Sequence, residues 1–463
     1  MTHIDVEILR TRARDGDPEA QFDLALRYSD GTGVPENAST AYRWLTKAAE
    51  GGHLEAMGAL GRCFHGGLGC PEDVGLAIQW YEKALARGAD DVHGDLAQVL
   101  CDERSGEARN VERAIQLLQE GWENHQDAAC AGILSEIYED ENGDDALSLQ
   151  WARTAADAGD GAAMVTLGYR YRFGEGVERD LKQMLHWYRR GADHGDPTAI
   201  ANLAICYQNG EAVKRNPDRA FALREEAAEM GHQGSRVWLA FALVDGTGCE
   251  PDPARGRELL EMLAEEDPEV AHDLADRLID GPGLEQDVEA GLRWMHSAAQ
   301  RSYGPALTYL GVLSWYGKHV PEDRARAMQL YGQAMELGDP YAAANVGFAT
   351  LGGDEVTRDP RRGVELLVSA ATKGNAHAAL WLAERWLEGA QDIPRDPARA
   401  VEILEACVAE EEDGDVLFHL AELVRDGRGV DADLPRALEL FQLAEINGRD
   451  SRVERGQLRR QLR

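Results

Sequence analysis

The side chains best able to do chemistry in this chain are its seven cysteines, whose thiolates could bind zinc, form disulfides or act as nucleophiles. A structural zinc site needs closely paired cysteines such as CxxC, and the sequence contains no such pair. The chain contains a repeated sequence unit, described below, and the cysteines stand at different positions in its different copies. We therefore expect buried free thiols. The seven are Cys63, Cys70, Cys101, Cys130, Cys206, Cys249 and Cys407.

Other motifs of catalysis and ligand binding are missing from the sequence. There is no phosphate loop with Gly-Lys-Ser or Gly-Lys-Thr, no HExxH and no Gly-x-Ser-x-Gly. The Gly-x-Gly segments, such as 31–33, follow a predicted helix, whereas a nucleotide loop follows a strand. The acidic run from Glu410 to Asp413 lacks the alternating ligands of a calcium loop, and we expect His53 and His232 to be exposed linker residues. The sequence predicts no catalytic residue, cofactor or metal site.

The elements that would position a site form a repeated unit, with its cleanest copy in residues 159–195. Apolar residues recur there at intervals of four, which places them on one stripe of a helix. Glycines at 174 and 176 predict the end of this helix, because glycine adopts a positive φ without steric penalty. Asp180 then suits the start of a second helix. The unit is predicted to be a helical hairpin. The apolar stripe consists of Ala163, Leu167 and Tyr171.

The same offsets recur along the chain, so the sequence predicts stacked copies of this hairpin. One hairpin cannot bury its apolar stripe alone, and neighbouring copies must cover it. We expect an all-α solenoid of about twelve hairpins in residues 16–448 and a capping helix in residues 1–15, with Ile4, Ile8 and Leu9 on one face. Residues 449–463 are basic and form either a final helix or an interaction tail. Copies begin at Gly16, Gly52, Gly88, Gly195, Gly231, Gly338 and Gly374.

Two copies in residues 88–158 are irregular. In the third, residues 101–110 replace the glycine-rich bend and contain a single glycine. A contact loop and plain sequence drift are both compatible with this departure. A tryptophan recurs at one offset on the second helices, where we expect it to lie in the core. The residues concerned are Trp44, Trp80, Trp151, Trp187 and Trp294.

Composition restricts the partners. The formal net charge is −35 at pH 7, so nucleic acid and anionic membrane surfaces would be repelled over most of the surface. No stretch approaches the roughly eighteen apolar residues that a membrane helix needs, and the start of the chain has no apolar core of the signal-peptide kind. We expect a soluble, cytoplasmic protein that binds neither nucleic acid nor membrane and is a monomer or a weak homo-oligomer.

The unit reads Leu-Gly-x-x-Tyr-x-x-Gly-x-Gly-Val, then Asp, then Trp-Tyr and a closing Gly. With this motif it resembles the Sel1-like repeat, a relative of the tetratricopeptide repeat. The resemblance covers roughly residues 16–448 and implies a right-handed α/α superhelix whose first helices line a concave face. It also implies an adaptor or regulator that holds protein partners. A cysteine-rich, secreted branch of the family is linked to β-lactam binding, but this chain lacks the cysteine pair in each repeat. The matching residues are Leu167, Gly168, Tyr171, Gly174, Gly176, Val177, Asp180, Trp187, Tyr188 and Gly195.

Two positions of each first helix, two and five residues after the repeated leucine, would face the groove. In the middle of the chain these positions are mainly apolar or aromatic, whereas the outer units carry polar residues such as Arg62, Gln98, Glu136, Glu384 and Glu422. An exposed apolar strip would be a binding site; the alternative is that neighbouring first helices bury it. The predicted partner-binding residues are Tyr169, Arg172, Phe173, Ile205, Phe241, Val312, Trp315, Tyr316 and Phe348.

Three functions fit these observations. The first is a non-enzymatic scaffold or regulatory adaptor that binds a peptide or helix of another protein in an apolar groove, with a basic partner favoured by the acidic surface. The second, by family analogy alone, is a binder of small molecules or cell-wall fragments with β-lactamase-like hydrolase activity. The third is a self-associating structural protein in which the groove of one copy receives a terminus of another.

Overall fold

The computed structural model describes residues 3–89, 91–140, 143–353, 355–390 and 392–461, and its elements there are almost entirely α-helices. A 3₁₀ helix, η1, spans Glu103–Ala108, and an isolated β-bridge joins Ala390 and Ile393. The α-helices are α1 His3–Arg14, α2 Pro18–Asp30, α3 Ala38–Glu50, α4 Leu54–Gly66, α5 Val74–Leu85, α6 His93–Cys101, α7 Val111–His125, α8 Ala128–Asp140, α9 Asp145–Asp157, α10 Gly161–Phe173, α11 Leu181–Asp193, α12 Pro197–Asn209, α13 Pro217–Glu229, α14 Gln233–Asp245, α15 Pro253–Glu266, α16 Pro268–Ile279, α17 Val288–Gln300, α18 Gly304–Tyr316, α19 Arg324–Glu336, α20 Pro340–Gly352, α21 Pro360–Ala371, α22 Ala376–Glu388, α23 Pro397–Glu410, α24 Gly414–Asp426, α25 Leu434–Ile446 and α26 Arg452–Gln461.

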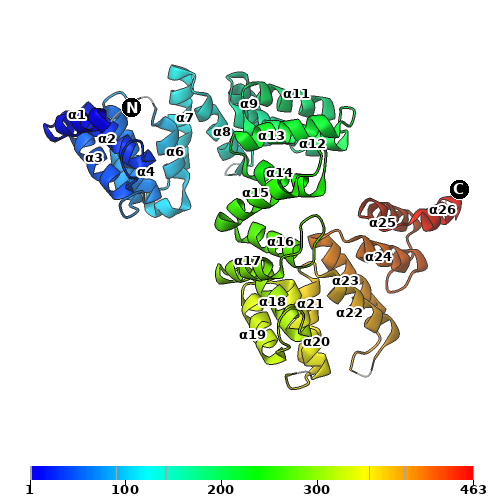
Figure 1. Ribbon diagram of the computed structural model, residues 1–463. Coiled ribbons are helices and arrows are strands. Elements are labelled where there is room, and N and C mark those ends of the chain that lie inside the picture. The colour runs from blue at the N-terminus through cyan, green and yellow to red at the C-terminus, as the bar shows by residue number, and fades with distance from the viewer. Residues whose placement is uncertain (1–2, 90, 141–142, 354, 391, 462–463) are drawn as a thin grey trace. The chain divides into compact units, whose positions relative to one another are not determined.

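Successive helices pair as hairpins, from α2 with α3 to α24 with α25, which confirms the predicted tandem of twelve all-α hairpins (Figure 1). We call the even-numbered helices α2 to α24 first helices and the odd-numbered helices α3 to α25 second helices. The chain divides into two compact units, Met1–Leu239 and Ala240–Arg463, which are described separately. No helix in the described residues is long and apolar enough to cross a bilayer.

Residues at fixed places in each copy start and stop the helices. In the fifth hairpin, Asp160 accepts a hydrogen bond from the Ala163 amide at 2.8 Å and so caps α10. Gly174 ends this helix at φ +83°, a left-handed conformation that glycine adopts without strain. Asp180 accepts hydrogen bonds from the Lys182 and Gln183 amides and starts α11. The predicted glycine bend and the predicted second start are therefore confirmed.

The two helices of this hairpin approach closely at Gly168. A Cβ atom on Gly168 would lie 2.2 Å from Cε1 of Tyr188, so the tyrosine ring fills the space that a side chain would need. Gly61 and Gly311 have the same relation to Tyr81 and Tyr331, at 2.6 and 2.5 Å. Each tyrosine stands twenty residues after its glycine. The Leu-Gly and Trp-Tyr parts of the repeat are therefore two sides of one packing contact.

The third and fourth hairpins depart from this plan. In the third, η1 occupies the irregular bend and folds back on the preceding hairpin, because Arg104 pairs with Glu72 at 2.9 Å and Asp102 lies 3.3 Å from His65. In the fourth, Ser135 stands where Gly168 stands in the fifth. It belongs to a buried polar cluster in which the guanidinium of Arg170, from α10, donates to Ser148 Oγ at 2.6 Å and pairs with Glu139, and the two serine hydroxyls lie 3.2 Å apart.

Helices precede and follow the hairpins. On α1, Leu9 and Ala13 are buried against α2, whereas Ile8 is exposed; the prediction that Ile8 shares the packed face is wrong, and the side chain of Ile4 lies outside the described residues. Within the basic segment, α26 buries Leu458, and Arg455 pairs with Glu445 of α25.

The prediction that five tryptophans of the second helices lie in the core is correct only for Trp187, which is buried. The other four, Trp44, Trp80, Trp151 and Trp294, are half-buried. In the first two hairpins a lysine one turn further along covers the ring, with Lys47 Nζ 4.4 Å from the Trp44 centroid and Lys83 Nζ 4.0 Å from that of Trp80. These indoles therefore form the margin of the core, where a cation can stack on the open face.

Candidate partner-binding surfaces on the first helices

Exposed aromatic side chains are confined to the first helices. In the described part of the chain, four tyrosine or phenylalanine side chains are classed as exposed: Tyr169 at 49%, Phe173 at 53%, Tyr316 at 74% and Tyr341 at 54%. They lie on α10, α18 and α20. The phenylalanine, tyrosine and tryptophan side chains of the described second helices are buried or half-buried. This asymmetry marks the first-helix surface as the place where aromatic area is left open.

The first unit presents two of these side chains as a pair on α10. The rings of Tyr169 and Phe173, one turn apart, have centroids 4.5 Å apart at an interplanar angle of 48°. The Arg172 guanidinium lies 5.4 Å from the Phe173 centroid and is held there by Glu211, with Nη2 and Oε1 2.8 Å apart. The structure therefore brings together three residues that the sequence predicts to contact a partner. Ile205, on α12 of the same unit, is half-buried.

The predicted residues in the second unit are less open. Arginines from neighbouring elements cover two of the rings: Arg277 lies 5.5 Å from the Phe241 centroid and pairs with Asp245, and Arg324 lies 5.2 Å from the Trp315 centroid. Val312 is half-buried, and Tyr316 alone among the predicted residues of this unit is strongly exposed. At two further groove positions the alternative of burial holds, because Val244 and Ile279 are buried.

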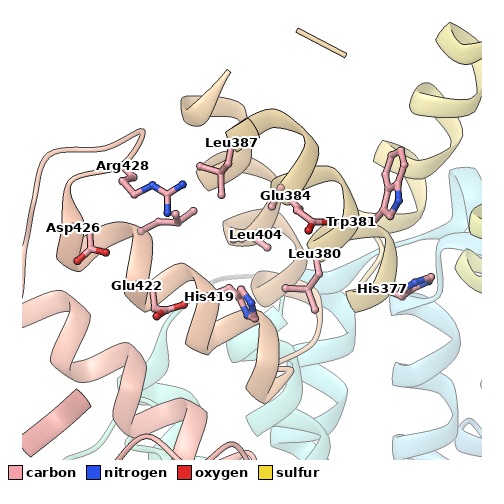
Figure 2. A pocket seen from close by; sticks show the side chains of 12 residues that line it. His377, Leu380, Trp381, Glu384, Leu387, Leu404, His419, Glu422, Asp426 and Arg428 are labelled. Carbon is pink, nitrogen blue, oxygen red and sulfur yellow. The ribbon is translucent and has the colours of Figure 1, made fainter. Parts of the chain in front are cut away.

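A pocket of about 420 Å³ lies between the first helices α22 and α24 (Figure 2). Its apolar lining includes Leu380, Trp381 and Leu387 from α22. Leu404 of α23 and Leu423 of α24 are buried core residues that also line the cavity. The pocket is therefore a hollow in the second unit with a floor made of core side chains.

The polar side chains of this pocket are mainly acidic. Glu384 from α22, Glu422 and Asp426 from α24, and Arg428 from the bend after α24 line it, as do His377 and His419. The Arg425 side chain donates to Asp426 at 2.6 Å and holds the pKa of that carboxyl below its usual value. The neighbours of the two glutamates lie further away, with Arg385 3.7 Å from Glu384 and Arg425 3.8 Å from Glu422.

Phe348 connects the sequence prediction to the pocket. Its ring lies 5.0 Å from the ring of His377 and 5.5 Å, edge to face, from that of Trp381. Phe348 itself is half-buried and supports the pocket wall from α20. The sequence did not predict the pocket. Glu384 and Glu422 occupy predicted groove positions of their two hairpins, but their charge indicated only a polar end of the groove.

The seven cysteines are free thiols. Cys63, Cys130, Cys206 and Cys407 are free and buried, as predicted, whereas the remaining three free cysteines are half-buried. Burial raises the pKa of the Cys206 and Cys407 thiols to about 11 and that of Cys130 to about 12. In the described ranges, no three His, Cys, Asp or Glu side chains gather as metal ligands would.

Comparison with known proteins identifies the repeat. The family described as Sel1 repeat matches residues 18–53, 54–88, 140–160, 161–196, 197–232, 235–268, 268–303, 304–339, 340–375, 376–406 and 415–448. These matches cover well over half of the chain and leave out most of the third and fourth hairpins.

Solved structures of the same repeat are also similar to this chain. A protective antigen of uropathogenic Escherichia coli that displays an SLR fold is 25% identical, with 99% of this chain and 91% of that chain covered and a TM-score of 0.45. A Sel1 repeat protein from Oxalobacter formigenes is 24% identical over 68% of this chain and 90% of that chain, with a TM-score of 0.41.

The repeat sets the general class of function. Proteins built from Sel1 repeats are generally non-catalytic scaffolds for protein interaction. The matches to the Sel1 repeat over well over half of the sequence, in a chain that folds as twelve helical hairpins, show that this chain belongs to the Sel1 repeat family.

Proposed function

We propose that this protein is a non-enzymatic scaffold or regulatory adaptor that holds a peptide or helix of a partner protein on its first helices. The observation that carries the proposal is the confinement of exposed aromatic side chains to those helices. The proposed contact residues are those predicted from the sequence, with the exposed Tyr169, Phe173 and Tyr316 as anchors.

The physical basis is the cost of leaving aromatic surface in water. Tyrosine and phenylalanine are enriched in the cores of protein interfaces, where a buried ring contributes much apolar area with few rotatable bonds. Tyr169 and Phe173 already stack on each other, and Arg172 is fixed by Glu211, so little side-chain entropy remains to be lost on binding. Such a pre-ordered group is suited to act as an interface anchor.

Charge favours a basic partner and opposes self-association. With a net charge of −35, two copies of the chain repel each other, whereas a basic protein is drawn towards the surface and associates faster at low salt. The thiols of Cys206 and Cys407 are poor candidates for the nucleophile of a hydrolase, because a thiol with a pKa of about 11 stays protonated at neutral pH.

The test compares three baits in affinity capture from native lysate, with bound proteins identified by mass spectrometry. They are the wild type, the variant Tyr169→Ser/Phe173→Ser, and the control Leu147→Ser/Met262→Ser, which removes two exposed apolar side chains from second helices. We expect a partner that the wild type and the control retain and the aromatic variant loses. If all three baits retain the same proteins, the proposal is wrong. Circular dichroism checks that the variants keep their helices.

A further inference from the structure

We infer that the pocket between α22 and α24 receives an arginine or lysine side chain of the partner peptide, while a neighbouring apolar side chain of that peptide packs against the apolar wall formed by Leu380 and Leu387. The inference rests on the proposed function, because it names the partner's chemistry at one place on the first-helix surface. It concerns a site that the aromatic pair on α10 does not include.

The shape of the pocket fits side chains rather than a flat surface. At about 420 Å³ it lies within the usual range for ligand-binding cavities and can hold one long side chain together with part of another. The buried Leu404 and Leu423 close its inner end, and Leu380 and Leu387 form apolar walls. Arginine and lysine carry long apolar stems that such walls can pack against while the charged group reaches the rim.

The charges of the pocket select a cation. Glu384 and Glu422 project from the two helices that face each other across the cavity, as Figure 2 shows, and Asp426 lies one turn beyond Glu422. Arg428 is the one arginine or lysine of the lining that the structure describes, so carboxylates outnumber such cations three to one. Asp426 is bound by Arg425, whereas the arginines beside the two glutamates lie 3.7 and 3.8 Å away, beyond hydrogen-bond distance. Both glutamates can therefore accept hydrogen bonds from a guanidinium or ammonium group.

A second copy of the chain is a poor occupant. Its net charge of −35 is repelled by an acidic pocket. Its basic C-terminal region is also engaged within its own unit, because Arg449 lies 4.9 Å from the Phe418 centroid and pairs with Asp415, and Arg455 pairs with Glu445. A basic segment of a different protein matches both the local and the overall charge.

The experiment selects peptides from a phage-displayed library of short random sequences on the immobilised full chain. We expect enrichment of arginine or lysine next to an apolar residue. The best peptide is then labelled, and its Kd is measured by fluorescence anisotropy for the wild type and for Glu384→Gln/Glu422→Gln. We expect the Kd to rise about tenfold or more in the variant, because charge-assisted hydrogen bonds are lost.

Two controls separate a pocket effect from a general charge effect. Glu402→Gln/Glu439→Gln removes two exposed carboxylates from second helices of the same unit and should change the Kd by less than about twofold. Replacing the peptide's arginine by citrulline, which is neutral and nearly the same shape, should weaken binding to the wild type as much as the pocket variant does.

Three results would overturn the inference: no enrichment, enriched peptides without a basic residue, or equal loss of affinity in the pocket variant and its control. Peptides that bind but ignore the pocket variant leave the proposed scaffold function standing, since they can be tested on Tyr169→Ser/Phe173→Ser. If the aromatic variant loses its lysate partners while Glu384→Gln/Glu422→Gln binds peptide like the wild type, the pocket inference is wrong and the proposed scaffold function stands.

Discussion

The aromatic pair on α10 and the pocket between α22 and α24 are two different ways to make a contact surface from the same repeat. The pair protrudes, and its two rings are about half exposed on a single helix. The pocket is a hollow between two first helices, with core residues at its inner end. The difference teaches that a protrusion can be changed without disturbing the fold, whereas a hollow shares its atoms with the core.

Shortening the pocket floor gives the largest expected effect. Leu404→Ala removes a fully buried side chain of α23 and should cost about 2–5 kcal/mol, whereas Tyr169→Ala should cost less than about 1 kcal/mol. Hydrogen exchange of the α22–α24 and α10–α11 amides measures each region separately, which matters because long repeat arrays need not unfold as one. Equal losses of hydrogen-exchange protection from both substitutions would show that the pocket floor contributes no more to the core than the aromatic pair does.

The packing beneath the aromatic pair gives the second prediction. Gly168→Ala places a Cβ atom 2.2 Å from the Tyr188 ring and should destabilise the fifth hairpin by about 1–3 kcal/mol. The matched control is Gly332→Ala on α19, where an added Cβ meets nothing within 4 Å and the substitution should stabilise by about 0.5–1 kcal/mol. Hydrogen exchange of the α10–α11 and α18–α19 amides compares the two. Opposite changes in protection are expected, and a stabilising Gly168→Ala would contradict the described contact.

The dependence of binding affinity on salt concentration should also distinguish the two surfaces, with a smaller effect than the substitutions above. Binding of a basic peptide at the acidic pocket should weaken about three- to tenfold between about 50 mM and 500 mM NaCl, because screening shortens the range of its attraction. Contacts that depend on the Tyr169–Phe173 pair should change less, since apolar burial is not screened. Anisotropy titrations of one peptide against Glu384→Gln/Glu422→Gln and Tyr169→Ser/Phe173→Ser at both salt concentrations show whether the salt dependence disappears with the glutamates.

Lowering the pH should have the smallest effect, which acts on stability through the carboxyl group of Asp426. The pKa of Asp426 is lower in the folded chain than its usual value, so its ionised form stabilises the fold above the unfolded pKa of about 3.9 and the contribution is lost as the pH falls towards the folded value. The side chain is partly exposed, so Asp426→Asn should cost only about 0.2–1 kcal/mol at pH 7. Thermal melts of wild type and variant should converge below about pH 3. A constant difference across this range would show that charge is not the cause.

The fold was predictable because it depends on residue types at fixed spacing. The four-residue intervals, the bend at Gly174 and the helix start at Asp180 require only local geometry, and the structure confirms them. The same spacing placed Tyr169 and Phe173 on a first helix, where they are exposed. It failed for His53, expected as an exposed linker, because the ring stacks on Phe22 at 4.4 Å and accepts a hydrogen bond from the Ala56 amide.

The pocket was not predictable, because it depends on contacts between repeats. Whether a groove position is open depends on its neighbours, and these differ from place to place: Val244 and Ile279 are buried, whereas Glu384 and Glu422 face a cavity. The irregular bend of residues 101–110 is similar, since its pairing of Arg104 with Glu72 joins residues of two hairpins. A pattern within one repeat carries no information about such contacts.

The Gly168–Tyr188 contact has a consequence for how the chain can evolve. A mutation of the glycine alone meets the tyrosine ring, and a mutation of the tyrosine to a smaller residue leaves a cavity, so either single step lowers stability. A lineage can leave this state by first shrinking the tyrosine and then enlarging the glycine. The same step of twenty residues joins Gly347 to Leu367, Ala275 to Met295 and Ala421 to Phe441. We therefore expect the side-chain sizes at the two positions to covary across family members.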